Sequence, residues 1–448
     1  MIKYYTNAKL ISLDPSALYM ENAFLKTDGS KIACIGNMQA FNAQSIEAGA
    51  ELEDVKGKII MPGMVCTHSH FYGQLIRGMA VHYRLRNWQN VLQQLWWNVD
   101  RSLDEQMNYA SAVMGLVEGI KCGVTTFIDH HASPSCCQGS LDIIEEAVKK
   151  IGARAVLAYE TSDRNGEQSR REGLAENVRF LEKCKGRGED DTVRGMFGLH
   201  ALYSLSESTL KQAAEMESSF NTGFHIHCAE DIADVVCSYK AHDMHVVEYL
   251  YRMGILKDKS ILAHFVHTEA EEWKLVAETG TTIAHNPQSN ANNAVGICPV
   301  DSMLRSGVHV ALGGDGFYYD LFQELNIAMM LQKLGSKNPS AMGGDLMEKL
   351  AFENPYRVVS QAFDMPAGQL KSGYAADFIM LNYIPPTPLH AGNIMSHITS
   401  AFTGHVSDTV INGRRVVKEG VVLGISEAEA FADCRAQSKR LGEKYGLM

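Results

Sequence analysis

The chain of 448 residues is longer than one hydrophobic core usually holds, so we expect two structural units or one large barrel with an appendage. Apolar residues make up 46% and charged residues 21% of the chain, which excludes an intrinsically disordered protein. Asp and Glu number 52 against 41 Lys and Arg, and the formal net charge of -11 argues against a nucleic acid or an anionic membrane as partner.

Three further classes of protein are disfavoured by sequence pattern. Residues 1–6 lack a basic region followed by an apolar stretch, so we expect no export signal and a cytoplasmic protein. No apolar run is long enough to span a bilayer. The ten cysteines show no CxxC spacing, which indicates buried thiols in a reducing compartment and no disulfide framework.

Residues 1–57 open the chain with short, half-alternating apolar runs. Asp-Pro, Asp-Gly and Gly-Asn turn signals separate these runs. The pattern predicts β-strands.

Residues 58–369 have a different texture, in which short apolar runs alternate with longer helical patterns. This alternation predicts a parallel sheet covered by helices. The number of strand-like runs is the number that a (β/α)8 barrel requires, so we predict an α/β fold with a TIM-like barrel in preference to a doubly wound sheet. The runs end near Cys66, Ile128, Tyr159, Leu199, Ile226, Ala263, Ala284 and Leu312.

The β texture returns near residue 370. Asn412-Gly413 lies between two apolar runs, as a hairpin turn does. We expect residues 1–57 and 370–424 to form one small composite β-sandwich domain. The charged, alanine-rich residues 425–448 predict a C-terminal helix.

His68 and His70 follow an apolar run, at the end of a predicted strand. Alternation along a strand points both imidazoles to one side, into the mouth of the barrel. This geometry suits one metal ion. The alternative is a pair of hydrogen-bonded turn histidines with no ligand role.

A second cluster lies at another strand end. His225 and His227 point to the same side, so spacing does not decide which of them is a ligand. Glu230 follows on the next loop, within reach of a water or substrate held at the strand end. Two more predicted strands end at His264 and before Asp315. Barrel enzymes carry their catalytic groups at the carboxyl ends of strands, where these residues converge.

Five segments carry a further pattern: Met61–His70, His227–Glu230, Ala263–His267, His285–Asn290 and Leu312–Gly316. Together they resemble the amidohydrolase superfamily, and within it the mononuclear ATZ/TRZ group of deaminases and s-triazine hydrolases. The resemblance covers the whole chain, including the terminal β segments. A narrower resemblance, to one aminohydrolase branch of that group, rests on Leu95–Asp104, Ile128–Pro134 and Glu160–Asn165.

The resemblance implies one divalent metal per subunit, usually zinc with Fe2+ as the alternative. It implies that His68, His70, His227 and Asp315 are the ligands, and it thereby selects His227 over His225. Binuclear members need a carboxylated lysine at a mid-barrel strand end, and Glu160 and His200 stand at those ends instead. We therefore expect a mononuclear site.

The implied catalytic residues are Glu230, His264 and Asp315. Zinc lowers the pKa of bound water to about 7, and Asp315 is expected both to bind the metal and to accept the water proton. Glu230 is expected to carry a proton to the ring nitrogen and the departing amine, and His264 to bond the attacking water or stabilise the intermediate. The expected reaction deaminates a purine- or pterin-like heterocycle with release of ammonia.

Polar residues in loops after predicted strands are candidates for substrate binding. They are Gln74, His130, His131, Arg164, His200 and Asn290. We interpret Trp88, Trp96 and Trp97 as core or subunit interface in preference to a substrate lid, and we expect a homodimer. The alternatives are a hydrolase of the same group that removes chloride or an alkylamine or opens a cyclic amide, and a non-enzymatic binding protein.

Overall fold

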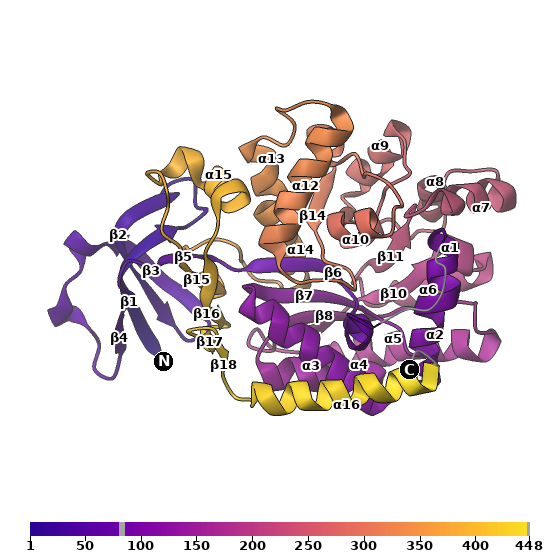
Figure 1. Ribbon diagram of the computed structural model, residues 1–448, viewed down its shortest axis with the longest axis horizontal. Helices are drawn as coiled ribbons and strands as arrows, with labels where there is room; N and C mark the ends of the chain where they lie inside the picture. The colour runs from indigo at the N-terminus through magenta and orange to yellow at the C-terminus, as the bar shows by residue number, and fades with distance from the viewer. Residues whose placement is uncertain (80–85, 446–448) are drawn as a thin grey trace.

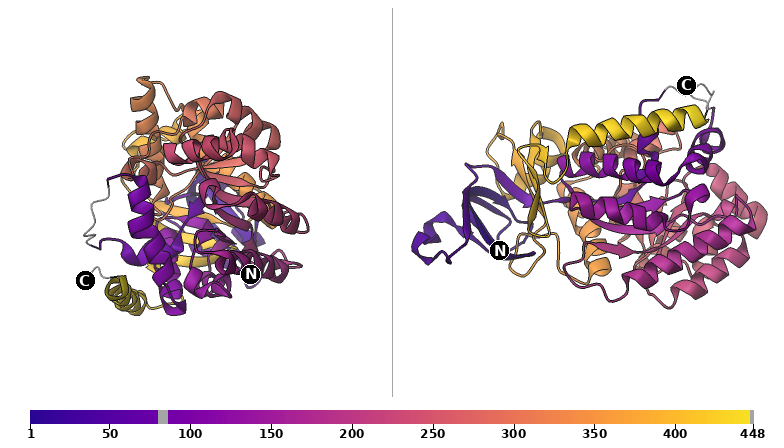
Figure 2. Two further views of the ribbon diagram at one scale, coloured as in Figure 1. Left: turned by 90° about the vertical axis from the view of Figure 1, so that its right-hand side faces the viewer. Right: turned by 90° about the horizontal axis from the view of Figure 1, so that it is seen from below.

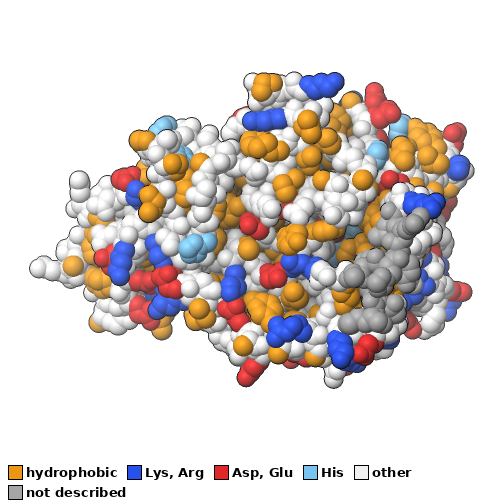
Figure 3. Space-filling view, viewed as in Figure 1, with side chains coloured by type: hydrophobic (Ala, Val, Ile, Leu, Met, Phe, Trp, Pro, Cys, Tyr) orange, Lys and Arg blue, Asp and Glu red, His pale blue; other side chains and the backbone are white. Residues whose placement is uncertain are grey.

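The computed structural model describes residues 1–79 and 86–445. A β-sheet built from both ends of the chain lies at one end of the molecule, and a helix-covered barrel forms the other (Figure 1). Among the described helices, none combines the length and the apolar character needed to cross a membrane. Acidic and basic side chains are interspersed on the face in Figure 3, which shows no broad basic field.

Strands from the two chain ends form a single nine-stranded sheet. Its order is β18-β17-β16-β15-β5-β1-β2-β3, with β4 paired to β1. β15 pairs antiparallel with β5, so that Ile379 lies opposite Met61 and joins the two chain ends. The sheet therefore reaches Pro62, beyond the boundary expected at residue 57. The strands are β1 (Ile2–Ile11), β2 (Tyr19–Asp28), β3 (Lys31–Asn37), β4 (Glu51–Asp54), β5 (Ile59–Pro62), β15 (Phe378–Asn382), β16 (His405–Ile411), β17 (Arg414–Lys418) and β18 (Val421–Val422).

The β16–β17 hairpin is confirmed at the predicted turn. Ile411 pairs with Arg414 across Asn412 and Gly413, whose φ angles are 53° and 71°. Asn and Gly adopt this left-handed conformation most readily, which is why the dipeptide marks a two-residue turn. The sheet has its own apolar core, in which the ring of Tyr5 packs edge-on against Phe378 at 5.3 Å between centroids.

Two all-parallel ladders form the barrel, and they confirm the predicted fold. One ladder is β6-β7-β8-β9 and the other β10-β11-β12-β13-β14. Bridges from Ser69 to Asp315 and from Thr161 to Leu199 connect the ladders at both junctions. The strands are β6 (Met64–Ser69), β7 (Val124–His131), β8 (Arg154–Tyr159), β9 (Val193–Gly195), β10 (Phe197–Ala201), β11 (Phe224–Cys228), β12 (Ile261–His264), β13 (Thr282–His285) and β14 (His309–Leu312).

Helices cover the outside of the barrel (Figure 2). In the helix Ser140–Ile151 the buried Leu141, Ile144 and Val148 recur at the spacing of one helix face, and Gly152 ends the helix with a φ of 84°. The longer helices are α3 (Glu105–Lys121), α4 (Ser140–Ile151), α5 (Glu167–Cys184), α6 (Glu207–Glu217), α7 (Ile232–His242), α8 (Val246–Arg252), α9 (Ala270–Thr279), α11 (Val300–Arg305), α12 (Leu321–Ser336) and α14 (Asn354–Phe363).

The chain ends in helix α16 (Glu427–Tyr445), which lies along α3 (Figure 1). Its Cys434 thiol bonds to the carbonyl of Ala110, and its Ser438 hydroxyl donates to the carbonyl of Leu75. The helix predicted over 425–448 includes residues 446–448, which lie outside the described residues.

Candidate active site

Four buried side chains meet at the carboxyl ends of three barrel strands. His68 lies in β6 and His70 just beyond it, His227 lies in β11, and Asp315 follows β14. Each is at most 8% exposed. The backbone N–H of Asp315 donates to the carbonyl of His68 (2.9 Å), which closes the barrel and brings the carboxylate beside His68 and His70.

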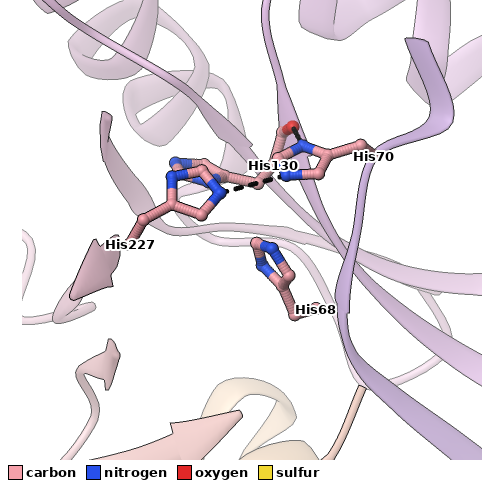
Figure 4. A group of neighbouring side chains, drawn as sticks. All are labelled: His68, His70, His130 and His227. Atoms are coloured by element: carbon pink, nitrogen blue, oxygen red, sulfur yellow. Dashed lines mark hydrogen bonds between the residues drawn. The ribbon is translucent and has the colours of Figure 1, made fainter. Parts of the chain in front are cut away.

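The tautomers of two of these histidines follow from their backbone partners. Nδ1 of His70 donates to the carbonyl of His130 (2.6 Å; Figure 4), and Nδ1 of His227 donates to the carbonyl of His200 (2.8 Å). Each Nε2 atom therefore carries a lone pair, and the two Nε2 atoms lie only 3.1 Å apart. Two facing lone pairs repel unless a cation lies between them, so this pair fits a metal ion.

The remaining candidate ligands complete the same pattern. Oδ1 of Asp315 lies 3.4 Å from Nε2 of His70 and 3.8 Å from Nε2 of His68. Ligands about 2.1 Å from a tetrahedral zinc lie roughly 3.4 Å from each other, close to these separations. Burial lowers the pKa of His68 and His227 well below the usual range, so both imidazoles are neutral and available as ligands at neutral pH.

His225 has a different place from His227, although both point to the same side of β11. Its Nε2 lies 2.8 Å from Nδ1 of His68, and its ring stacks on His130 at 4.4 Å between centroids. With Nε2 of His68 acting as a ligand, Nδ1 of His68 donates to His225. His225 thus orients His68 from behind.

Glu230 and His264 lie next to the ligand cluster. Oε2 of Glu230 is 3.6 Å from Nε2 of His264, and that nitrogen is 3.9 Å from Oδ2 of Asp315. Burial, together with the charge of Asp315, raises the pKa of Glu230 well above its usual range, so Glu230 can hold a proton at neutral pH. Nδ1 of His264 donates to Oδ1 of Asn290 (2.8 Å), which fixes the imidazole.

The backbone is strained beside the site. Ala229, His264, Phe265 and Asp315 have φ angles of 49°, 74°, 54° and 58°, in the left-handed region that non-glycine residues rarely adopt. Such conformations cost about 1–3 kcal/mol each and concentrate at functional sites. At three strand ends of the site, the backbone therefore adopts an unfavourable conformation that places the side chains of the site.

A narrow cavity opens on the cluster, and aromatic side chains line much of it. Trp88, Trp96 and Trp97, on the segment after β6, face this cavity. Trp88 also packs in the core, so interpreting the three tryptophans as core or subunit interface alone was incomplete. Tyr72 and Tyr203 line the same cavity.

Among the six residues expected to bind substrate, His200 lies in the cavity wall. Gln74 donates to the Tyr319 hydroxyl (3.1 Å) and to the carbonyl of Gly316, and is held within the structure. Nε2 of His131 lies 2.8 Å from the hydroxyl of Ser133. These last two side chains are engaged in internal contacts.

The other three candidates are also engaged. Arg164 donates to Asp100 and, through Nε, to the hydroxyl of Ser162 (3.1 Å). A ring nitrogen of His130 lies within 4.8 Å of ring nitrogens of His68, His70 and His227, and its ring stacks on His225. Asn290 accepts a hydrogen bond from His264.

Sequence analysis missed three polar residues of the site. Glu160 and Asp100 line the cavity, and the Ser289 hydroxyl donates to Oδ2 of Asp315. Glu160 directly follows the fully buried strand β8, and a carboxylate at that position was a usable signal. Asp100 lies inside a helix, and no sequence pattern there indicates a site residue.

Comparison with known proteins gives one family and several relatives. A sequence model of the amidohydrolase family matches residues 59–416. A 5'-deoxyadenosine deaminase of Methanocaldococcus jannaschii is 31% identical over 409 residues, covering 90% of this chain and 93% of that protein. A zinc-bound adenosine deaminase from Xanthomonas campestris superposes with a TM-score of 0.87 at 21% identity, covering 99% and 98% of the two chains. An atrazine chlorohydrolase from Arthrobacter aurescens gives a TM-score of 0.82 at 19% identity, covering 97% and 100%.

Proposed function

Because this chain belongs to the amidohydrolase family, we propose that it is a metal-dependent deaminase that releases ammonia from a purine- or pterin-like amino heterocycle. The observation that carries the proposal is the pair of facing Nε2 atoms of His70 and His227, 3.1 Å apart, beside Asp315 and the protonated Glu230. The deaminase relative at 31% identity supports the choice of reaction.

The proposed ligands are His68, His70, His227 and Asp315, around one zinc ion, with Fe2+ as the alternative. A bound zinc would lower the pKa of a water molecule to about 7 and so supply a nucleophile at neutral pH. Three neutral imidazoles and one carboxylate leave a single positive charge at the centre, which favours a nucleophile that is negatively charged after proton loss.

The protein's own groups handle the protons. Oδ2 of Asp315 lies 3.9 Å from Nε2 of His264, so the space between them can hold the attacking oxygen of water, with the carboxylate accepting its proton. Glu230, protonated at neutral pH, donates its proton to the ring nitrogen next to the attacked carbon. It then takes up the proton of the added hydroxyl group and transfers it to the leaving amine, and the proton held by Asp315 finally returns to Glu230. His264 stabilises the oxygen that adds to the ring.

The substrate is proposed to lie between the aromatic walls of the cavity. Trp88 and Trp97 offer faces on which a flat heterocycle stacks. His200 is the proposed polar contact from the predicted set, whereas Gln74, His130, His131, Arg164 and Asn290 act through their neighbours.

Two further properties are proposed for the whole protein. The ten cysteines are all unpaired, which supports a reducing, cytoplasmic location. A homodimer is supported by an exposed apolar stripe on α7, where Ile232, Val236 and Tyr239 are 54%, 43% and 41% exposed at helical spacing. Light scattering of the purified protein tests the dimer. The sheet of the chain ends and the barrel are proposed as separate domains.

Ammonia release and metal content measured on one preparation test the proposed reaction. The panel holds adenosine derivatives, aminopurines, aminopterins, cytosine and aminotriazines, with chlorotriazines and cyclic amides beside them. We expect ammonia from at least one amine and one metal ion per chain. Release of chloride or alkylamine, or opening of a cyclic amide, without ammonia would identify the other hydrolase of the group. Metallated protein inert on the whole panel would favour a binding protein.

A further inference from the structure

Glu230 is the proposed proton carrier, and its carboxyl group has no hydrogen-bond partner that fixes its position. Oε1 of Glu230 is buried without a partner among the described residues. Oε2 lies 3.6 Å from Nε2 of His264, which is beyond hydrogen-bond distance. The place of this carboxyl group in the site therefore depends on the backbone that carries it.

The peptide group between Ala229 and Glu230 is held at both of its polar atoms. The carbonyl of Ala229 accepts from the backbone N–H groups of Val266 and His267, both at 3.0 Å, which connects the loops that follow β11 and β12. The N–H of Glu230 donates to Oδ2 of Asp234 (3.0 Å). Asp234 is the one partner that acts through its side chain, so a substitution there removes a single one of these hydrogen bonds.

The backbone before this peptide group is strained. Ala229 has a φ of 49°, in the left-handed region that non-glycine residues rarely adopt. Such a conformation persists only where the surrounding contacts fix the backbone. When the hydrogen bond from Asp234 is lost, the peptide group can relax towards a more favourable conformation, and the side chain of Glu230 moves with it.

The ordinary role of an acidic residue in the first turn of a helix does not explain Asp234. Helix α7 begins after Asp231, whose Oδ1 accepts from the backbone N–H of Ala233 (3.0 Å) and so caps the helix. In a capping box, the acidic side chain of the first turn accepts from the N–H of the cap residue itself. Asp234 instead reaches one residue further back, to Glu230, and is only 4% exposed, although most aspartates face solvent.

The acceptor role of Asp234 does not depend on its charge. Burial raises the pKa of Asp234 to about 7, so its carboxyl group is present in both protonation states near neutral pH. A protonated carboxyl group keeps an acceptor oxygen, and so does the amide group of asparagine. The hydrogen bond to the N–H of Glu230 is therefore compatible with either state of Asp234 and with an Asn variant.

We propose that Asp234 is a positioning residue, which holds the backbone of Glu230 so that the carboxyl group of Glu230 reaches the atoms between which it transfers protons. This inference rests on the proposed deaminase function. Asp234 is not among the residues that line the cavity, so its effect on the reaction must pass through Glu230. A displacement of about 1 Å at a reacting group can lower a rate about 100-fold.

A double-mutant cycle tests whether Asp234 acts through Glu230. Asp234→Ala is expected to lower kcat for ammonia release about 10- to 100-fold, with little change in KM and unchanged zinc content. In the Glu230→Gln background, the same substitution is expected to lower kcat by less than about 3-fold, because no proton carrier remains to be positioned. Equal losses in the two backgrounds, or no loss in the wild-type background, would overturn the inference.

Three further variants separate loss of the hydrogen bond from general damage to the fold. Asp234→Asn keeps an acceptor oxygen and should retain kcat within about 3-fold of wild type, whereas a loss as large as that of Asp234→Ala would contradict the acceptor role. Asp234→Leu fills the space of the carboxyl group and replaces Asp234→Ala if that variant does not fold, and a wild-type kcat in it would contradict the proposal. Asp433→Ala, at an exposed aspartate of α16, is the matched control and should behave as wild type.

Amide hydrogen exchange tests the hydrogen bond without a substrate. The N–H of Glu230 is expected to exchange about 10-fold faster in Asp234→Ala than in wild type or Asp234→Asn, as measured by mass spectrometry on peptides that contain Glu230. An exchange rate that is unchanged in Asp234→Ala would overturn the inference. If the wild type releases ammonia from no amine, the deaminase proposal fails, and this measurement still decides whether Asp234 holds the backbone of Glu230.

Discussion

Strand β8 carries a buried ionisable side chain near each end, and the surroundings of the two side chains differ. At its start, where the barrel meets the terminal sheet, Arg154 is fully buried and its Nε donates to Asp377 (2.9 Å), whose other oxygen accepts from the backbone of Asn412 (2.6 Å). Just beyond its end, Glu160 lines the cavity, burial raises the pKa of its carboxyl to about 8, and its Oε2 has no hydrogen-bond partner among the described residues. The charge pair of Arg154 and Asp377 joins two parts of the fold, whereas the perturbed carboxyl of Glu160 lies in the candidate active site.

The largest expected effect follows from the loss of a proposed metal ligand. His68→Ala removes one of the three proposed imidazole ligands. We therefore expect this variant to lose stoichiometric metal and its activity to fall below detection. Metal analysis and ammonia release on the same sample measure both. A variant that keeps its zinc and its activity would remove His68 from the ligand set.

The next effect separates metal binding from proton transfer. Glu230→Gln keeps the shape of the side chain and removes the proton carrier, so we expect unchanged zinc and a kcat lower by about 100- to 10,000-fold. The matched control is Glu248→Gln on α8, where the glutamate side chain is 37% exposed, and this variant should behave as wild type. A wild-type kcat in Glu230→Gln would show that Glu230 does not carry the proton.

A substitution at Arg154, at the start of β8, should lower the stability of the fold and leave the catalytic activity unchanged. Arg154→Met leaves Asp377 buried without its cation and is expected to cost about 3–5 kcal/mol of unfolding free energy, with zinc content and activity per folded molecule retained. Urea unfolding measures the loss. Adding Asp377→Leu to the variant should recover much of it, since neither charge is then buried alone. Loss of zinc in Arg154→Met would show that the two ends of the strand are coupled.

The last expected effect is a change of stability with pH, measured as a slope, at another buried carboxyl group. Burial raises the pKa of Glu324 to about 8, while one of its oxygens accepts from the backbone of Gln288 (3.0 Å). The folded chain keeps this proton between about pH 4.3 and 8 whereas the unfolded chain releases it, so stability falls by up to about 1.4 kcal/mol per pH unit across that window.

Glu324→Gln should therefore gain stability relative to wild type as the pH rises from 5 to 8. Urea unfolding at three pH values across this window tests the sign. A difference that stays constant with pH would show that Glu324 is ionised in the folded protein.

Much of the fold and of the ligand cluster is predictable from sequence for a physical reason. Strands buried on both faces are continuous apolar runs, and the first polar residues after each run stand at the mouth of the barrel. That logic placed His68, His70 and Asp315 correctly next to one another. It did not separate His225 from His227, because a period of two gives both the same side and only depth along the strand distinguishes them.

The substrate side was less predictable because it depends on partners distant in sequence. Arg164 stays a predicted substrate contact, and its ion pair with Asp100, on a helix after β6, was not predictable from the sequence. Glu160 was considered only as the position of an absent lysine, although a carboxylate there has chemistry of its own. Neither the Arg164–Asp100 contact nor the place of Glu160 in the cavity wall leaves a periodic signal in the sequence.

The central claim is that three imidazoles and one carboxylate bind a single metal ion. X-ray absorption spectroscopy of the zinc-loaded protein tests it most directly. The account predicts one zinc per chain with three imidazole nitrogens at about 2.0–2.1 Å and oxygen ligands at about 2.0–2.2 Å. A spectrum with sulfur ligands or with fewer than three imidazoles, or a protein that retains no zinc after dialysis, would contradict it.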